Sequence, residues 1–352
     1  MDMERIRKIN LACSVVRFVY MKKFTYAMSG VDILKEKKAV SALVDRITYT
    51  RKGAGTPITR IGHYAGLIEF GEYVLALTSD GVGSKILVAD ALQKWDTIGI
   101  DCVAMNVNDL LAMGVEPVAF SDYIAIDHPS VERMEQIGAG LERGAELSNI
   151  TIVGGETATL PEIVRGFDLA GTCLGIALRN RVITGEKIEV GDLLIGLPST
   201  GLHSNGYTLA RKIIEESDYT YHDPLPKGSG KTIGEALLEP TKIYIEILNV
   251  LENVDAHGLA HITGGGLLKL HRLTEHGFNI SNPIKPQPIF EFLQNLGSVE
   301  NDEMYRTFNM GMGFLIVVPE DDAPMTLRLK GAQIVGEVVK SGISINGLEL
   351  EP

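Results

Sequence analysis

The irregular order of strand-like and helix-like segments is the feature that most constrains the fold of this chain. Short apolar runs typical of buried strands, such as 73–78 and 193–197, occur among amphipathic stretches with helical periodicity, such as 96–113 and 130–148. These segments do not alternate as strictly as the strands and helices of a doubly wound parallel sheet. The sequence therefore predicts an α+β fold.

The length of the chain indicates two domains. At roughly 150 residues per domain, 352 residues make about two. A polar, turn-rich stretch at 179–192 marks the expected boundary. We expect residues 1–28 to be an extension outside the core, residues 29–180 to form an N-terminal sheet domain, and residues 181–345 to form a C-terminal α+β domain.

Helical periodicity also predicts a helix near the start of the N-terminal domain and another within the C-terminal domain. Residues 35–49 carry apolar side chains three and four positions apart, and residues 239–253 repeat the pattern. The second stretch begins with Glu-Pro-Thr, and proline is common in the first turn of a helix. By contrast, residues 151–153 predict a short buried strand that runs into a Gly-Gly turn.

Charge and cysteine content exclude several classes of function. The 33 Lys and Arg residues face 45 Asp and Glu residues, which gives a net charge of −12. Because nucleic-acid phosphates repel such a surface, binding through a broad basic face is excluded. The three cysteines are far apart and form no CxxC pair, which fits a reducing cytosol. No apolar run reaches the roughly 18 residues of a membrane-spanning helix, so we expect a cytoplasmic protein with neither nucleic-acid nor membrane partners.

The first candidate site follows the strand at 73–78, where the sequence reads Thr-Ser-Asp-Gly-Val-Gly-Ser-Lys over residues 78–85. Gly81 and Gly83 allow backbone N–H groups to turn toward a phosphate, with Ser84 and the charge of Lys85 beside them. Asp80 can hold a magnesium ion next to that phosphate. A plain Asp-Gly turn explains the same residues equally well.

Four more residues with side-chain oxygens accompany this loop. Asp101 and Asn108 are seven residues apart, which places them on one face of a mostly apolar helix, and Asp109 follows. Buried polar groups of this kind cost free energy unless they are paired or bound to metal. Glu156 follows the Gly-Gly pair, with Gly155 and Thr157 on either side. A solvated polar stripe and an exposed glutamate on a turn are the alternatives.

Taken together, these carboxylates favour one kind of cofactor. Hard oxygen donors without a paired His or Cys indicate magnesium rather than zinc. Beside a phosphate loop, the metal would carry a nucleoside triphosphate such as ATP. The predicted metal ligands are Asp80, Asp101, Asp109 and Glu156.

The C-terminal domain holds two further candidate loops. Residues 201–206 read Gly-Leu-His-Ser-Asn-Gly, in which His203 can transfer protons near neutral pH, although simple helix capping by Ser204 or Asn205 accounts for the loop as well. Residues 262–267 contain three consecutive glycines, typical of a phosphate cradle or of tight packing. The histidines at 257 and 261 are expected to be packed or solvated rather than to bind a ligand.

In this order and spacing, the segments resemble the phosphoribosylformylglycinamidine cyclo-ligase family, also called aminoimidazole ribonucleotide synthetases. The resemblance covers about 29–340. It starts at Ser-Gly-Val-Asp, residues 29–32, and rests on the following segments: 78–85, 98–110, 153–157, 201–207, 262–266 and 303–313. No motif is decisive alone, but six in the family's order make the match specific.

The resemblance implies an activity. Formylglycinamidine ribonucleotide and ATP would give aminoimidazole ribonucleotide, ADP and phosphate in purine biosynthesis, through phosphorylation of the formyl oxygen. It also implies an N-terminal domain that binds Mg-ATP and forms a homodimer through its sheet. One departure is Thr48, which stands where the family has a lysine thought to contact ATP; Lys52 is a candidate replacement.

Site roles also follow from the resemblance, by position. It implies Lys85, His203 and Asp101 as the catalytic residues, with proton transfer by His203 as our own hypothesis. ATP and magnesium would be held by Asp80, Gly81, Gly83, Ser84, Lys85, Asn108, Asp109, Gly155, Glu156 and Thr157. The ribonucleotide would be held by Ser204, Asn205, Thr263, Gly264 and Gly265.

Two alternatives remain open. A small-molecule kinase of the same architecture, similar to thiamine-monophosphate kinases, would share the nucleotide site. Such a kinase is expected to lack the Gly-Leu-His-Ser-Asn-Gly and Glu-Met-Tyr-Arg-Thr-Phe-Asn segments found here. A nucleotide-binding regulator without turnover would release no phosphate in response to substrate.

Overall fold

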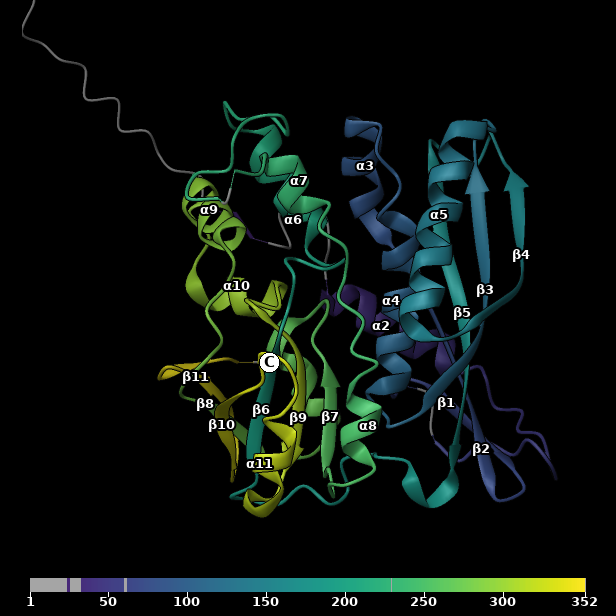
Figure 1. The fold of residues 1–352 in the computed structure, drawn as a ribbon, viewed down its shortest axis with the longest axis vertical. Helices are drawn as coiled ribbons and strands as arrows, with labels where there is room; N and C mark the ends of the chain where they lie inside the picture. The colour runs from purple at the N-terminus through teal and green to yellow at the C-terminus, as the bar shows by residue number, and fades with distance from the viewer. Residues whose placement is uncertain (1–23, 26–32, 60–61, 229, 352) are drawn as a thin grey trace, which may run out of the picture.

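The computed structural model describes residues 24–25, 33–59, 62–228 and 230–351. Within this part of the chain, two mixed sheets stand side by side, each with its own helices (Figure 1). The predicted α+β fold in two parts is confirmed. Within the same residues, no helix combines the length and the apolar character needed to cross a bilayer.

The N-terminal sheet has five strands in the order β1-β2-β5-β3-β4. Its pairs are antiparallel except for β3 and β4. Its strands are β1 (Gly66–Phe70), β2 (Tyr73–Gly81), β3 (Glu116–Ile126), β4 (Thr151–Thr159) and β5 (Phe167–Leu178). Its helices are α2 (Ile33–Val44), η2 (Gly83–Lys85), α3 (Ile86–Leu92), α4 (Ile98–Leu111) and α5 (Val131–Ser148).

Helix α4 occupies the centre of the molecule, between the N-terminal sheet and the C-terminal domain (Figure 1). It packs very closely against α5, since a Cβ on Gly99 would collide with the backbone of Leu141. The start of α5 agrees with the sequence: the Ser130 hydroxyl accepts a hydrogen bond from the Arg133 N–H at 3.4 Å. Because α4 lies between the two sheets, its polar side chains can contact both domains.

The C-terminal sheet has seven strands in the order β12-β11-β8-β10-β6-β9-β7. They are β6 (Leu193–Pro198), β7 (Gly258–His261), β8 (Gly277–Ile280), β9 (Met312–Val318), β10 (Gln333–Val339), β11 (Ile343–Ile345) and β12 (Leu348–Glu349). The helices are η3 (Arg179–Arg181), α6 (Tyr207–Glu215), α7 (Ile233–Leu237), α8 (Ile247–Leu251), η4 (Gly266–Arg272), α9 (Pro288–Gly297), α10 (Asn301–Thr307), η5 (Glu320–Asp322) and α11 (Ala323–Thr326). The fully buried strand β9 lies between β6 and β7 at the centre of this domain.

Three local predictions are wrong. The expected helix over 239–253 is present only as α8, because side chains of α4 form hydrogen bonds with the backbone of residues 240–244. The strand expected at 151–153 continues through the two glycines as β4, an edge strand that is mostly exposed rather than buried. The first strand is longer than expected, so that Asp80 and Gly81 belong to β2 instead of a turn.

The strands fall into two groups along the chain, one for each sheet. The N-terminal strands end at Leu178 and the C-terminal ones begin at Leu193, on either side of the polar stretch that suggested the boundary. Within the predicted extension 1–28, the structure describes Phe24 and Thr25 alone. Phe24 is buried, and its N–H donates to the carbonyl of Gly297 at 3.3 Å, which ties it to the C-terminal domain.

Candidate active site

A buried ion pair joins the two domains at α4. Lys85 and Asp101 are both inaccessible to solvent, and the lysine Nζ lies 2.9 Å from Asp101 Oδ1 and 2.7 Å from Oδ2. The lysine also donates to the carbonyls of His203 at 3.1 Å and Glu239 at 2.7 Å. Burial lowers the pKa of Lys85, while Asp101 opposes that shift. The ammonium is thus directed toward protein acceptors.

The same face of α4 binds the backbone of residues 240–244. Asp101 Oδ1 accepts from the Thr241 N–H at 2.7 Å and from its hydroxyl at 2.6 Å. Two turns later, the Asn108 amide donates to the Lys242 carbonyl at 2.8 Å and accepts from the Tyr244 N–H at 3.1 Å. The predicted polar face of α4 therefore exists, and it pairs with backbone of the C-terminal domain.

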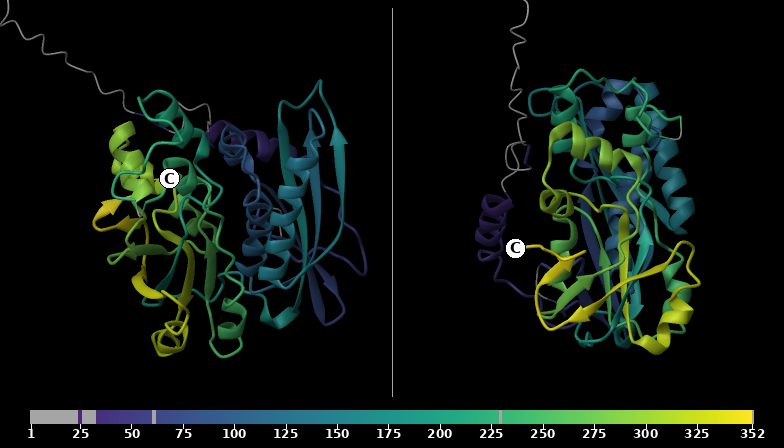
Figure 2. Two further views of the ribbon diagram at one scale, coloured as in Figure 1. Left: turned by 45° about the horizontal axis from the view of Figure 1, so that its top comes forward. Right: turned by 90° about the vertical axis from the view of Figure 1, so that its left-hand side faces the viewer.

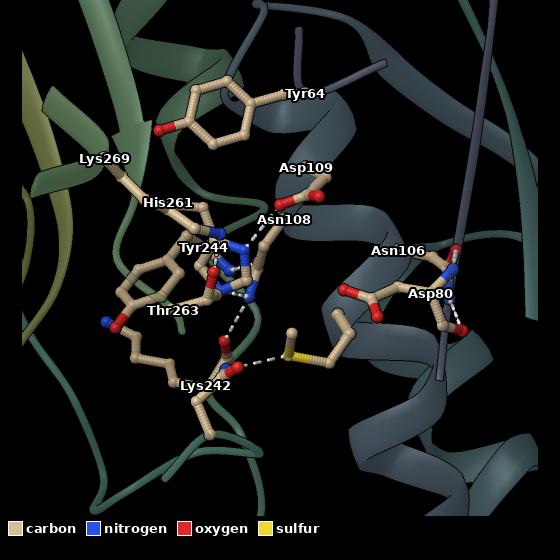
Figure 3. Close-up of polar contacts among 12 residues, drawn as sticks. Tyr64, Asp80, Asn106, Asn108, Asp109, Lys242, Tyr244, His261, Thr263 and Lys269 are labelled. Atoms are coloured by element: carbon tan, nitrogen blue, oxygen red, sulfur yellow. Dashed lines mark hydrogen bonds and ion pairs between the residues drawn. The ribbon is translucent and has the colours of Figure 1, made fainter. Parts of the chain in front are cut away.

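Asp109, next on the helix, faces a histidine of β7. Asp109 Oδ1 lies 2.8 Å from Nδ1 of His261, whose side chain is inaccessible to solvent (Figure 3). Because a carboxylate can only accept, the ring proton lies on Nδ1, and Nε2 keeps its lone pair 3.4 Å from the Asn108 amide. Burial lowers the pKa of His261, and Asp109 acts in the opposite direction. This pair has the geometry of a general base and its orienting carboxylate.

His203 lies in the same buried region in an unusual backbone conformation. Its φ is +63°, and its Nε2 accepts from the Thr200 N–H at 3.3 Å. Its Nδ1 is buried without a hydrogen-bond partner among the described residues. Burial holds the pKa of His203 well below its usual value, so the ring is neutral. A side chain on Gly313 would collide with this ring and with the Tyr244 hydroxyl, which leaves glycine as the residue that fits.

Asp80 reaches α4 from strand β2. Its backbone N–H donates to Asn106 Oδ1 at 2.9 Å, and the Asn106 amide returns a bond to its carbonyl at 3.1 Å. Burial, with the nearby charge of Asp109, raises the pKa of Asp80 to about 6. The charge of Asp109 therefore reaches Asp80, and a cation would compensate the two carboxylates.

The remaining loop residues lie around this region. The Ser84 hydroxyl is 3.1 Å from that of Thr208, and the Ser204 hydroxyl is 3.1 Å from that of Thr241. A Cβ on Gly264 would lie 2.9 Å from Oδ1 of Asn205, so these two predicted substrate residues are adjacent. Gly83 and Gly265 have φ values of +69° and +91°, a conformation that favours glycine.

Not all of the predicted ligands converge. Glu156 and Thr157 lie on the exposed strand β4, where Glu156 pairs in register with the exposed Tyr123. Gly155 faces the carboxylate of Asp122, which sequence analysis did not single out. In the part of the chain that the structure describes, no three His, Cys, Asp or Glu side chains gather closely enough to hold a metal ion.

Comparison with known proteins identifies the family. Models of AIR synthase related proteins match residues 62–177 as the N-terminal domain and 189–346 as the C-terminal domain. The phosphoribosylformylglycinamidine cyclo-ligase of Methanosarcina barkeri is 61% identical over 330 residues, covering 94% of this chain and 99% of that protein. The cyclo-ligase of Methanocaldococcus jannaschii is 47% identical over 333 residues, covering 92% and 94%.

The chain belongs to the phosphoribosylformylglycinamidine cyclo-ligase family. The predictions of this family and of an ATP-dependent cyclo-ligase of purine biosynthesis are thereby confirmed. A thiamine monophosphate kinase from Aquifex aeolicus has a similar fold, with a TM-score of 0.61 at 16% identity over 91% of this chain and 99% of that chain. That likeness concerns the fold alone, whereas the cyclo-ligases match in sequence along almost the whole chain.

The structure brings two further residues, His261 and Lys269, into contact with residues that sequence analysis singled out. His261 was expected to be packed or solvated, and its contact with Asp109 spans 152 positions of sequence. Lys269 follows the glycine run and reaches back to the hydroxyl of Thr263 (Figure 3). A signal was present for His261, since an unexplained carboxylate on an apolar helix requires a polar partner.

Proposed function

We propose that formylglycinamidine ribonucleotide is the substrate and that it binds between α4 and the loops 201–206 and 262–267. The formyl oxygen attacks the γ-phosphorus of ATP, and ADP leaves. A nitrogen of the amidine then attacks the formyl carbon and expels phosphate, which closes the five-membered ring. Phosphorylation is needed because an amide oxygen is a poor leaving group, and ring closure is favoured because the nucleophile is tethered.

The Asp109–His261 pair is the observation that supports this assignment. His261 can take up a proton at Nε2 while Asp109 stabilises the charged ring, which is the role that ring closure requires of a base. The neutral His203, with its unpartnered Nδ1, remains our second proton-transfer candidate. We assign Lys85 and Asp101 to holding the domains together, since their polar atoms already face one another and the 239–241 backbone.

We further propose magnesium as the ion that accompanies ATP. Magnesium is usually bound by one or two carboxylates together with phosphate oxygens and water, so four protein carboxylates are not required. Asp80 and Asp109 fit this donor set, because each is partly buried and the charge of Asp109 already raises the pKa of Asp80. When bound, the ion neutralises charge on the phosphates. Glu156 gains no support for this role from its exposed position on β4.

A homodimer is proposed through the uncovered face of the N-terminal sheet. Helices α4 and α5 cover the face nearer to the C-terminal domain, whereas Figure 2 shows the opposite face without a described helix. Apolar side chains are exposed there: Tyr73 is 40% exposed, Leu77 48% and Tyr123 43%. Burying this surface against a second copy would remove apolar area from water. We also propose a cytoplasmic location, where the purine pathway would supply the substrate.

The deciding experiment supplies the chain with formylglycinamidine ribonucleotide and Mg-ATP. We expect phosphate release that depends on the ribonucleotide, together with the coloured derivative of the aminoimidazole product. Thiamine monophosphate serves as the control substrate for the kinase alternative. Phosphate release without the aminoimidazole, or turnover only with thiamine monophosphate, would contradict the proposal; no turnover with either would favour a regulator.

A further inference from the structure

Lys269 is a cation beside the candidate site that the proposed mechanism has not used. It lies on η4, directly after the glycine run, and its ammonium contacts the hydroxyl of Thr263. Its Nζ lies 5.9 Å from the centre of the Tyr64 ring, and the Arg272 guanidinium lies 5.7 Å from the same ring. Figure 3 shows the Tyr64 ring above the side chain of Lys269, which extends toward His261 and Thr263. The aromatic ring thus supports two cations at one side of the candidate site.

The surroundings of Lys269 leave its charge poorly satisfied. Lys269 is partly buried, and burial lowers its pKa, while the carboxylates of Asp109 and Asp80 act in the opposite direction. Among the described residues, no carboxylate forms an ion pair with it, and its hydrogen-bond partner is one hydroxyl. An ammonium carries three donors, and buried charges are usually paired. An anion at this point would complete the site.

Lys85 differs from Lys269 in this respect. Lys85 faces a carboxylate and two carbonyls, all within 3.1 Å, so its donors have protein partners. Lys269 instead contacts the hydroxyl of Thr263, and the carboxylates of Asp109 and Asp80 act on it through their charge alone. Gly265 adopts φ +91° and carries no side chain to shield its backbone. A phosphate beside Thr263 would therefore reach a hydroxyl, the partly exposed backbone of Gly264 and Gly265, and an ammonium together.

We propose that Lys269 is a catalytic-site cation that donates to a phosphate oxygen of the bound reactants. This inference rests on the proposed function and assigns a residue to its phosphate subsite. Two reactants carry the required chemistry: the ribose 5′-phosphate of the ribonucleotide and the γ-phosphoryl group of ATP. Hydrogen bonds to charged groups are stronger than those between neutral groups. We therefore expect the loss of this contact to lower kcat/KM by about tenfold to a hundredfold.

The test compares K269M with K269R, which keeps the charge, and with K330M, which removes an exposed lysine elsewhere. Initial rates give kcat and the KM values for ribonucleotide and ATP, and a thermal melt follows each variant. We expect K269M to lose about ten- to a hundredfold in kcat/KM, with K269R less affected and K330M unchanged. A rise in KM for the ribonucleotide alone assigns the contact to its 5′-phosphate, whereas a fall in kcat assigns it to the transferred group.

Two kinetic results would overturn the inference. Wild-type constants for K269M would remove Lys269 from the site, and equal losses in K269M and K269R with lowered melting temperatures would make the residue structural. A binding measurement separates this inference from the proposed function. Inorganic phosphate titrated into the wild type should give a binding heat that K269M lacks, whether or not the ribonucleotide is turned over. The absence of that heat in the wild type, or its persistence in K269M, also overturns the inference.

Discussion

Replacing Lys85 by methionine removes the cation from a fully buried ion pair and leaves Asp101 facing Thr241 alone. Breaking a buried pair by removing one partner typically costs ~3–5 kcal/mol, because the remaining charge is not compensated. For domains of this size, each kcal/mol lowers the melting temperature by roughly 2–4 °C. We therefore expect K85M to melt about 6–20 °C below the wild type, measured by calorimetry or circular dichroism.

A matched double variant tests the cause. Asp101→Asn keeps an oxygen that can accept from the Thr241 N–H and hydroxyl, but it carries no charge. If the unpaired carboxylate is what destabilises K85M, then K85M/D101N will melt several degrees above K85M, although it carries one more substitution. Well below its melting temperature, K85M should retain kcat/KM to within about tenfold, a loss of about 1.4 kcal/mol in transition-state stabilisation.

The result that would refute this reasoning is a stable but inactive K85M. A wild-type melting temperature with a fall in kcat/KM of about a hundredfold or more would match the loss of one transition-state donor, which is worth roughly 3–4 kcal/mol. Lys85 would then act on the transferred phosphoryl group, as the sequence motif alone suggested, and the observed pair would be one of two arrangements of the side chain.

Four further outcomes are expected. Burial keeps the pKa of His203 well below 6.5, so as the pH falls the unfolded chain protonates this ring before the folded chain does. The stability that comes from keeping His203 neutral is therefore complete above pH 6.5. It is lost as the pH falls below that value, at up to ~1.4 kcal/mol per pH unit. H203N, which suits the positive φ, should therefore show a smaller fall in melting temperature between pH 7 and pH 5.5 than the wild type; an equal fall would contradict the assignment. N108A should destabilise the protein by about 2–5 kcal/mol in thermal melts, because a buried carbonyl and a buried N–H lose their partner, and a change below 0.5 kcal/mol would count against this. D109N should lower kcat by roughly a hundredfold or more with little change in melting temperature, and unaltered kcat would exclude the general-base pair. Y123D should convert the expected dimer to a monomer in sedimentation experiments, whereas an unchanged mass would move the interface elsewhere.

The sequence predicted the elements with strong periodicity and clear end signals. Helix α4 was expected because its apolar spacing is regular and Gly114 follows its end, and it agrees to within two residues at each end. The polar residues on it were also recognised as needing partners. Their partners could not be identified, because Thr241 lies 140 positions after Asp101 and a metal ion satisfies a carboxylate equally well in principle.

The errors have a related physical origin. Residues 239–253 have the apolar period of a helix, but hydrogen bonds from α4 side chains hold part of this backbone in an irregular conformation. Tertiary contacts of this kind override local preference. The glycines at 154–155 suggested a turn, but in β4 they extend a strand beside Asp122. His261 is packed, as expected, but a four-residue strand gives no indication that it faces Asp109.

The hydrogen bonds between α4 side chains and the backbone of 240–244 have a consequence for dividing the protein into fragments. A fragment that stopped near residue 180 would carry Asp101, Asn108 and Asp109 into water on a helix otherwise surrounded by Leu, Val and Ile. The complementary fragment would lose the only side-chain amide and carboxylate that the described structure offers to the Thr241 and Tyr244 N–H groups. Neither half is expected to be a self-sufficient folding unit, so a split or circularly permuted enzyme should be cut outside this junction.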